Sequence, residues 1–385
     1  MRPKVMIVGL GGLGGVLLEL LAREESMGEV VVASRDAARG EARCNLARTG
    51  AAAHGTPAVV RFVPLDLADV AGAAETFASE SPDLIVCTAS RQTWWLTELL
   101  PAAARGPLDR AGFGAWLPVH LALALKFMRA VEAGKYRGHT LVASFPDVVN
   151  VVLARAGLAP TAGLGNVDEI VPKIRHLAAA RLAVRPQEVR VLLVAHHALE
   201  PFVFGAPERE PPPYWVRVEH AGQDVTERVE ARSLLRAAYP LPPGPSWHFL
   251  TASSAIRLIR ALTTGDGGLV HVPGPLGLPG GYPVAASRAG IHMMELPGLT
   301  LDEAVALNER SHRFDGIDRI EADGGVVFAE PTASGMEEAL GYNLRRLVPA
   351  DADRAADELI ARFHEYAARH GVDVARALAI GRLIA

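Results

Sequence analysis

The 385-residue chain is poor in several residue types, and each scarcity narrows its class. Its two cysteines, Cys44 and Cys87, supply neither a disulfide framework nor a C-x-x-C metal pair, so we expect a reducing, cytoplasmic setting. No uninterrupted apolar run reaches the ~18 residues that span a bilayer, so we expect no membrane segment. Only 4 of the 39 basic residues are lysine, and the net charge of −4 gives no general field for nucleic acid. Half of the residues are hydrophobic, enough for two domains with sizeable cores.

Residues 5–36 carry the strongest pattern. Four apolar residues at 5–8 predict a buried strand, and glycines follow it in G-x-G-x-x-G spacing before an apolar helix over 16–22. In such a unit, the first glycine permits a tight turn, the second lets backbone approach a pyrophosphate, and the third lets helix and strand pack closely. The helix N-terminus then faces the phosphates. We expect a βαβ unit that binds a dinucleotide at Gly9, Gly11, Gly12, Leu13 and Gly14.

The same start also fits a secretory signal peptide, because Arg2 and Lys4 precede the apolar run. Against this alternative, five of the residues 9–15 are glycine, and no A-x-A cleavage site follows. A second strand also continues the periodic pattern. We therefore favour the βαβ unit.

The end of that second strand bears on which dinucleotide is bound. An acidic residue about 20 positions beyond the motif would accept hydrogen bonds from the adenosine ribose and favour NAD. Ser34 and Arg35 stand there instead, with Arg39 one helical turn further on. Since a guanidinium pairs bidentately with phosphate, we expect NADP rather than NAD. Asp36, one position later, leaves NAD as the alternative.

The order of elements predicts two domains of different class. Residues 1–150 alternate strands and helices, with a loop expected over 90–112, and the carboxyl ends of the strands place Ala89 and Phe145 at a ligand crevice. Beyond 150 the strict alternation stops, and we expect a strand over 189–195, a hairpin over 214–226, and short strands between helices over 253–262, 301–311 and 350–368. We predict an α/β fold: a Rossmann-type doubly wound parallel sheet (1–150), then an α+β catalytic or substrate domain (151–385).

Hydride transfer also requires a group that moves a proton, and histidine titrates near neutrality. His197 follows the apolar strand 189–195, and Asp168, in the first turn of a helix after a glycine turn, is the candidate carboxylate that orients its ring. A purely structural role for His196 or His197 is the alternative. A metal pair is poorly supported because neighbouring strand residues face opposite ways, so we expect no metal site.

Beyond the dinucleotide motif, residues 143–197 resemble the lactate/malate dehydrogenase superfamily. The segments that carry the resemblance are Ala143-Ser-Phe-Pro-Asp-Val-Val-Asn, Gly163-Leu-Gly-Asn-Val-Asp168, Leu182-Ala-Val-Arg-Pro186 and Val194-Ala-His-His197, and weaker similarity continues toward the C-terminus. The resemblance implies that His197 transfers the proton and Asp168 orients it. It also implies that Arg91 begins a loop that closes on substrate, that Arg110 binds a substrate carboxylate, and that Ser253 and Thr251 lie near the substrate. A homo-oligomer, dimer or tetramer, follows by the same resemblance.

Several positions depart from the family's pattern. Phe145 stands where the family has an asparagine, and Lys173 is nearest in register to the arginine that forks a substrate carboxylate, a planar contact that lysine does not supply. Trp94 and Trp95 lie in the closing loop, where they either meet substrate or pack as a lid. We therefore expect contacts from Trp94, Phe145, Lys173 and Ser253 to a small-molecule substrate larger and flatter than pyruvate.

These observations predict an NADP-preferring oxidoreductase that reduces a carbonyl, a 2-oxo acid or a related compound, or oxidises the matching alcohol. An opine- or imine-type amino-acid dehydrogenase and a non-catalytic dinucleotide-binding sensor or scaffold are the alternatives. An NAD-dependent glycosidase is a further one, to which Cys87 fits poorly because it lies inside a strand.

Overall fold

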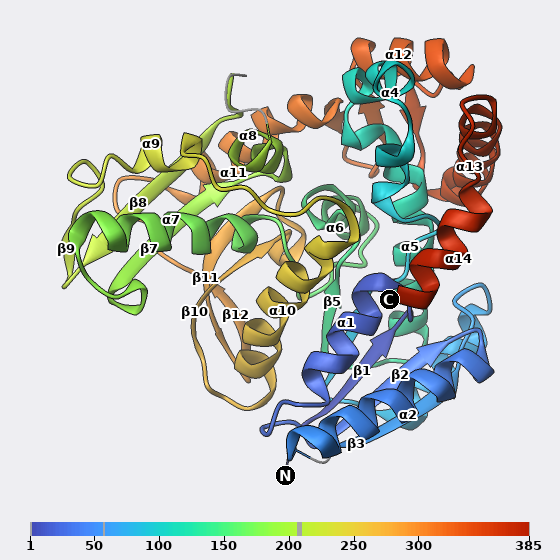
Figure 1. Cartoon of the computed structure of the whole chain (residues 1–385), viewed down its shortest axis with the longest axis horizontal. Coiled ribbons are helices and arrows are strands. Elements are labelled where there is room, and N and C mark those ends of the chain that lie inside the picture. The colour runs from blue at the N-terminus through green and yellow to red at the C-terminus, as the bar shows by residue number, and fades with distance from the viewer. Residues whose placement is uncertain (1, 57, 206–209, 385) are drawn as a thin grey trace.

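The computed structural model describes residues 2–56, 58–205 and 210–384 (Figure 1). Its first sheet has six parallel strands in the order β3-β2-β1-β4-β5-β6. These strands are β1 (Lys4–Val8), β2 (Glu29–Ser34), β3 (Val59–Pro64), β4 (Leu84–Cys87), β5 (His139–Val142) and β6 (Ala162–Gly163). The strand order reverses between β1 and β4, which places the ligand crevice of a doubly wound sheet at their carboxyl ends. The predicted α/β class is confirmed.

Helices cover both faces of this sheet, which explains why its central strands are apolar on both sides. The helices between its strands are α1 (Gly12–Leu21), α2 (Ala37–His54), α3 (Val70–Glu80), α4 (Ala102–Ala111), α5 (Leu117–Ala133) and α6 (Pro146–Arg155). In β1, Val5, Met6 and Ile7 are fully buried, and they alternate between two apolar clusters on opposite faces of the sheet.

The second sheet is antiparallel, in the order β10-β11-β7-β8-β9, with β12 paired to β11. Its strands are β7 (Val189–Ala195), β8 (Tyr214–His220), β9 (Gln223–Asp224), β10 (Gly268–Pro273), β11 (Gly281–Ser287) and β12 (Gly290–Met293). Its helices are α7 (Val167–Leu182), α8 (Glu200–Phe204), α9 (Ala231–Arg236), α10 (Trp247–Thr263) and α11 (Leu301–Ser311). The strand over 189–195 and the hairpin are as predicted, and so is the α+β character.

The C-terminal segment returns to the first sheet (Figure 1). It contains β13 (Ile317–Ile320), β14 (Val326–Phe328), α12 (Glu330–Leu340), β15 (Arg346–Leu347), α13 (Ala352–Arg369) and α14 (Val374–Ile384). Helix α12 packs on α4, and α13 packs on α5, where the rings of Trp116 and Phe363 meet edge to face at 5.2 Å. One apolar cluster therefore joins residues on both sides of position 150, and the division at that position stays a prediction.

Two local predictions are wrong. Residues 90–112 are not a loop, because they form the 3-10 turn η1 (Trp94–Leu99) and helix α4. Gly106 and Pro107 weaken the helical pattern in the sequence, but packing against α12 stabilises the helix. The strand expected to reach Phe145 ends at Val142, and Phe145 instead has φ of +47° directly before Pro146 opens α6.

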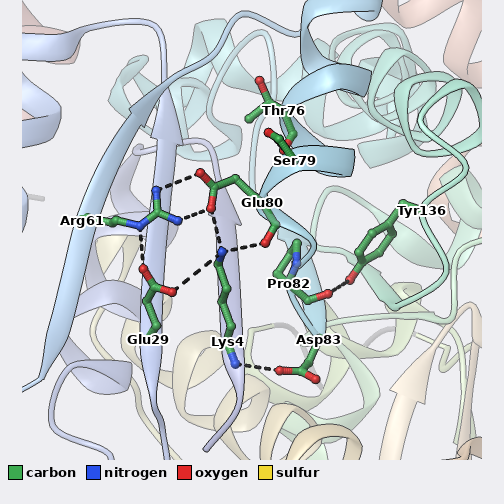
Figure 2. A network of polar contacts seen from close by, with 9 residues as sticks. All are labelled: Lys4, Glu29, Arg61, Thr76, Ser79, Glu80, Pro82, Asp83 and Tyr136. Carbon is green, nitrogen blue, oxygen red and sulfur yellow. Dashed lines mark hydrogen bonds and ion pairs between the residues drawn. The ribbon is translucent and has the colours of Figure 1, made fainter.

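A polar network connects the parallel strands at the end of the sheet away from the crevice (Figure 2). Lys4, at the start of β1, donates from Nζ to Glu80 Oε2 (2.7 Å), and Arg61 in β3 donates from Nη1 to Glu80 Oε1 (2.9 Å). Hydrogen bonds from Arg61 outweigh burial and lower the pKa of Glu80 to about 2. Tyr136 donates to the Pro82 carbonyl (2.9 Å), which fastens the start of β4. Arg61 also donates from Nε to Glu29 Oε1 of β2 (2.5 Å), so the network joins β1, β2 and β3 to the end of α3.

In the part of the chain that the structure describes, no single helix is long and apolar enough to cross a membrane. Two consecutive helical segments, residues 102–111 and 113–133, pass the length and composition test together, but their axes are bent by 88°.

Candidate active site

A cavity of about 1270 Å³ extends along the carboxyl ends of the parallel strands and into the second domain. The glycine turn after β1 lines it, together with residues at the ends of β2, β4 and β5. Residues from α7, α8 and α10 close its other side. Of the predicted site residues, the lining includes Gly9, Gly11, Gly12, Leu13, Ser34, Arg35, Arg39, Ala89, Arg91, Trp94, Phe145 and His197.

The glycine turn fits a dinucleotide pyrophosphate. Gly9 has φ of +103°, and a Cβ there would lie 2.8 Å from the Ala89 nitrogen. At Gly14 a Cβ would lie 2.1 Å from the Gly9 carbonyl oxygen, so these two glycines are required by packing. At Gly11 a Cβ would meet no atom within 4 Å, so the missing side chain leaves room in front of the N-terminus of α1. Gly12 lies under the His248 ring from α10, with which a Cβ would collide.

The end of β2 presents a basic lining. Arg35 and Arg39 line the cavity beside Ser34. Asp36 is occupied as the N-cap of α2, since its Oδ1 accepts from the Arg39 N–H at 3.0 Å. Ser34, Arg35 and Asp36 all line the cavity here, and the second carboxylate oxygen of Asp36 is not used by the cap.

His197 is held by a carboxylate that the sequence did not suggest. Its ring Nδ1 lies 2.8 Å from Asp315 Oδ2, and its backbone N–H donates to Asp147 Oδ1 at 2.9 Å. Burial alone would lower the pKa of His197, but the charge and hydrogen bond of Asp315, with the charges of Glu200 and Asp147, raise it to about 10. Because Asp315 fixes Nδ1, Nε2 is the nitrogen left for a ligand. The pair can hold a proton at Nε2 and release it.

Asp168 is not that partner, which corrects the predicted pairing. Its carboxylate is buried 3.5 Å from Arg257 Nη1 and 3.9 Å from His271 Nδ1, and it does not line the cavity. The position in the first turn of α7 is as predicted, but the neighbouring Glu169 is the residue that faces the cavity.

His196 takes the structural role that was the alternative for this pair. It is buried and does not line the cavity, its Nδ1 lies 3.2 Å from both the Ala198 nitrogen and Asp315 Oδ2, and its Nε2 lies 3.0 Å from His312 Nδ1. The two adjacent histidines therefore meet the same oxygen of Asp315, but only His197 lines the cavity.

Two further carboxyl groups stand beside His197. Glu200 Oε2 is 4.0 Å from His197 Nε2, and Glu169 Oε1 accepts from the Thr251 hydroxyl at 2.7 Å. Burial is the main cause that raises the pKa of Glu200 to about 7, and burial followed by the charge of Glu200 raises the pKa of Glu169 well above its ordinary value. The two carboxyl groups are close enough for each to change the pKa of the other. Such a pair shares a proton near neutral pH.

Aromatic rings enclose the imidazole on its other sides. The ring centroids of Phe113 and Phe145 lie 4.6 and 5.2 Å from that of His197. His120 of α5 stacks on Phe113 at 5.1 Å, its Nδ1 lies 2.8 Å from the Ser144 hydroxyl, and burial lowers its pKa to about 3. The positive φ of Phe145 aims its ring at this cluster, a strained conformation of the kind found at functional sites.

Four residues predicted to contact substrate have their side chains bound elsewhere, although one of them, Arg91, lines the cavity. Lys173 is buried outside the cavity lining, where its ammonium donates to the carbonyls of Val203 (2.7 Å) and Leu235 (3.0 Å). Arg110 is exposed and pairs with Glu338 of α12 at 2.8 Å. Ser253 is exposed and donates to the Phe249 carbonyl, whereas Thr251 lines the cavity. Arg91 does line the cavity, but its guanidinium pairs with Asp353 (3.3 Å) and Asp357 of α13.

The residues that sequence reasoning missed are Asp315, Glu200, Glu169 and His120. Asp315 lies in the turn after α11, too far along the chain for spacing to reveal it. Glu200 follows His197 by one turn and Glu169 adjoins Asp168, so both were within reach of the same motif. Cys87 is fully buried in β4, and burial raises the pKa of its thiol to about 12, which removes support for the glycosidase alternative.

Comparison with solved structures identifies the fold. A lactate dehydrogenase from Eimeria maxima, solved with NADH and oxamate, is 16% identical with a TM-score of 0.55 over 81% of this chain and 92% of its own. Malate dehydrogenase from Plasmodium falciparum is 14% identical, with a TM-score of 0.53 over 81% of this chain and 95% of its own. Lactate dehydrogenase from Cryptosporidium parvum, solved with lactic acid and nicotinamide adenine dinucleotide, is 16% identical. Its TM-score is 0.52 over 82% of this chain and 96% of its own.

The chain therefore has the fold of the lactate and malate dehydrogenases. This confirms the fold that the resemblance implied. No protein-family model matches the sequence, and no curated protein matches it either.

Proposed function

We propose that this protein is an NAD(P)-dependent oxidoreductase that interconverts a carbonyl compound larger than pyruvate and the matching alcohol. One observation carries the proposal: a single cavity is lined both by a glycine turn shaped for a dinucleotide and by His197, held at 2.8 Å by the buried Asp315. The likeness of fold to dehydrogenases solved with NADH or NAD supports a nicotinamide coenzyme.

In this proposal the coenzyme supplies a hydride, and so both electrons, to the carbonyl carbon. His197 donates its Nε2 proton to the carbonyl oxygen, the C=O double bond becomes a C–O single bond, and solvent returns the proton to His197. Asp315 is a positioning residue that keeps Nδ1–H in place and stabilises the imidazolium. The aromatic rings of Phe113 and Phe145 exclude water from the imidazole.

We further propose a preference for NADP. Arg35 and Arg39 line the cavity at the end of β2 beside Asp36, one oxygen of whose carboxylate is engaged at the cap of α2. A 2′-phosphate suits a guanidinium there, whereas no acidic residue ends β2 to bind a free ribose hydroxyl pair. Assembly as a homo-oligomer and a cytoplasmic location stay predictions.

The test is a panel of ketones, aldehydes and 2-oxo acids with NADPH and with NADH, using wild type and His197→Gln. The proposal expects coenzyme oxidation with at least one carbonyl compound and loss of about 100-fold or more in the variant. Turnover that survives the substitution would overturn the role of His197. Coenzyme binding without oxidation by any compound would instead support a non-catalytic sensor or scaffold.

Imine reduction is a second candidate, favoured by the carboxyl groups of Glu169 and Glu200 beside His197, since an iminium is cationic. The same panel with and without added primary amines separates the two reactions. Oxidation of NADPH that depends on the amine would establish imine chemistry.

A further inference from the structure

The charges around His197 are of one sign. The groups whose charge raises its pKa are Asp315, Glu200 and Asp147, all carboxylates, and Glu169 adds a fourth carboxyl through its contact with Glu200. Asp315 neutralises the imidazolium, and Glu169 with Glu200 shares a proton, so the cluster keeps a net negative charge near neutral pH. A carboxylate ligand placed at His197 would meet this charge at close range.

The cations that would compensate such a ligand are held elsewhere. Lys173 is outside the cavity, and Arg110 is on the surface. Arg91 and Lys126 do line the cavity, but both pair with Asp353 of α13, at 3.3 and 2.8 Å. Arg35 and Arg39 stand at the end of β2, on the coenzyme side. Among the described lining residues, none offers His197 the bidentate guanidinium that a substrate carboxylate needs.

Three buried polar atoms of the described cavity lining have no hydrogen-bond partner in the structure. They are Oε1 of Glu200, Oε1 of Gln92 and Nε2 of His120, a residue only 5% exposed. The low pKa of His120 keeps its ring neutral, so Nε2 accepts a hydrogen bond in the tautomer with Nδ1–H and donates one in the other. The oxygens of Glu200 and Gln92 are buried acceptors without a donor, which is costly and indicates that a ligand supplies N–H or O–H groups in this cavity.

The remaining lining near His197 suits a cation. Phe113 and Phe145 pack against the imidazole, and Trp247 lines the same cavity from α10. Aromatic faces attract ammonium groups, and together with carboxylates they form the usual recognition site for such groups.

We propose that the substrate carries an alkylammonium group, bound by Glu200 and Glu169, in place of the carboxylate of an oxo acid. This rests on the proposed function, because the reacting carbonyl is the one that receives the proton of His197. The redox step is unchanged: hydride to carbon, proton to oxygen.

The test uses three phenyl ketones that differ in one group: 2-amino-1-phenylethanone, 2-hydroxy-1-phenylethanone and phenylglyoxylate. Binding to the protein saturated with NADP⁺ is measured by calorimetry, where no turnover occurs. The proposal expects the ammonium compound to bind at least tenfold more tightly than the neutral one, and phenylglyoxylate to bind most weakly. Equal or tighter binding of phenylglyoxylate overturns it.

Glu200→Gln should reduce the preference for the ammonium compound about tenfold, and Glu169→Gln serves if the first variant does not fold. Glu338→Gln, the same change at an exposed carboxylate outside the cavity, should leave the preference unchanged. A variant that weakens only the oxidised coenzyme, relative to the reduced one, would assign the carboxylates to the nicotinamide and overturn the proposal. Failure of the wild type to bind either coenzyme, measured first, would instead reject the proposed function itself.

Discussion

Asp315 Oδ2 lies 2.8 Å from His197 Nδ1, although the two residues are 118 positions apart in the sequence. The turn after α11 brings the carboxylate to the strand end that carries the histidine. Burial opposes ionisation of Asp315, but the charges of His197 and His196 and hydrogen bonds from both hold its pKa below the usual range. The pair is therefore an ion pair at neutral pH, with Nε2 of His197 toward the cavity.

Removing this charge should move the pH dependence of the reaction. With the pKa of His197 at about 10, wild-type reduction should be flat through neutral pH and fall as pH rises through about 10, because the proton donor is then lost. In Asp315→Asn, the carboxylate that raises the pKa of His197 is gone, so burial lowers that pKa. The fall in rate should then occur below neutral pH, and reduction at pH 7 should slow about 10–100-fold. Initial rates across pH measure this. A slower variant with an unshifted profile would contradict the positioning role.

Two glycines should separate coenzyme binding from folding. Gly11→Ala adds a methyl group that meets no protein atom, so the fold should keep its stability while coenzyme binding weakens about tenfold or more. Gly14→Ala places a methyl against the Gly9 carbonyl oxygen and should lower the free energy of unfolding by about 1–3 kcal/mol. Thermal denaturation and coenzyme fluorescence titration give both values. Unchanged affinity in Gly11→Ala would argue against a pyrophosphate at this turn.

Arg35 should set the coenzyme preference. Arg35→Ala removes a guanidinium beside Ser34 and should weaken NADPH binding about tenfold or more, with little change for NADH. The ratio of the two dissociation constants is the readout, and NADH serves as the control within the same variant. If both coenzymes weaken equally, Arg35 does not contact a 2′-phosphate.

The network opposite the active site should contribute acid-sensitive stability. Glu80→Gln removes an acceptor for Lys4 and Arg61 and should lower the free energy of unfolding by about 1–3 kcal/mol at pH 7. The folded pKa of Glu80 is lowered from 4.5 to about 2, so this stability is present above pH 4.5 and lost as pH falls toward 2. Urea unfolding at pH 7 and pH 3 should show the gap between wild type and variant shrinking. A gap that widens in acid would contradict this account.

Local patterns were sufficient for much of the fold. The glycine spacing, the buried runs of β1, β2 and β7, and the hairpin were readable because each depends on neighbours in sequence. The site was less readable. His197 was found at its strand end, but its partner Asp315 comes from a remote turn, and Lys173 has the expected register yet bonds to backbone carbonyls away from the cavity. Helix α4 was missed because packing on α12 outweighs the weak propensity around Gly106 and Pro107.

The central claim is that a hydride passes between a nicotinamide coenzyme and a carbonyl carbon in the cavity that His197 lines. It is tested most directly with NADPH carrying deuterium at the transferable position of C4, with the carbonyl compound that the panel identifies and mass spectrometry of the product. One deuterium on the alcohol carbon is the predicted result, with the deuterated alcohol formed more slowly by His197→Gln than by wild type, by about 100-fold or more. Coenzyme oxidation without deuterium in the product, or no oxidation with any carbonyl or imine, would contradict the account.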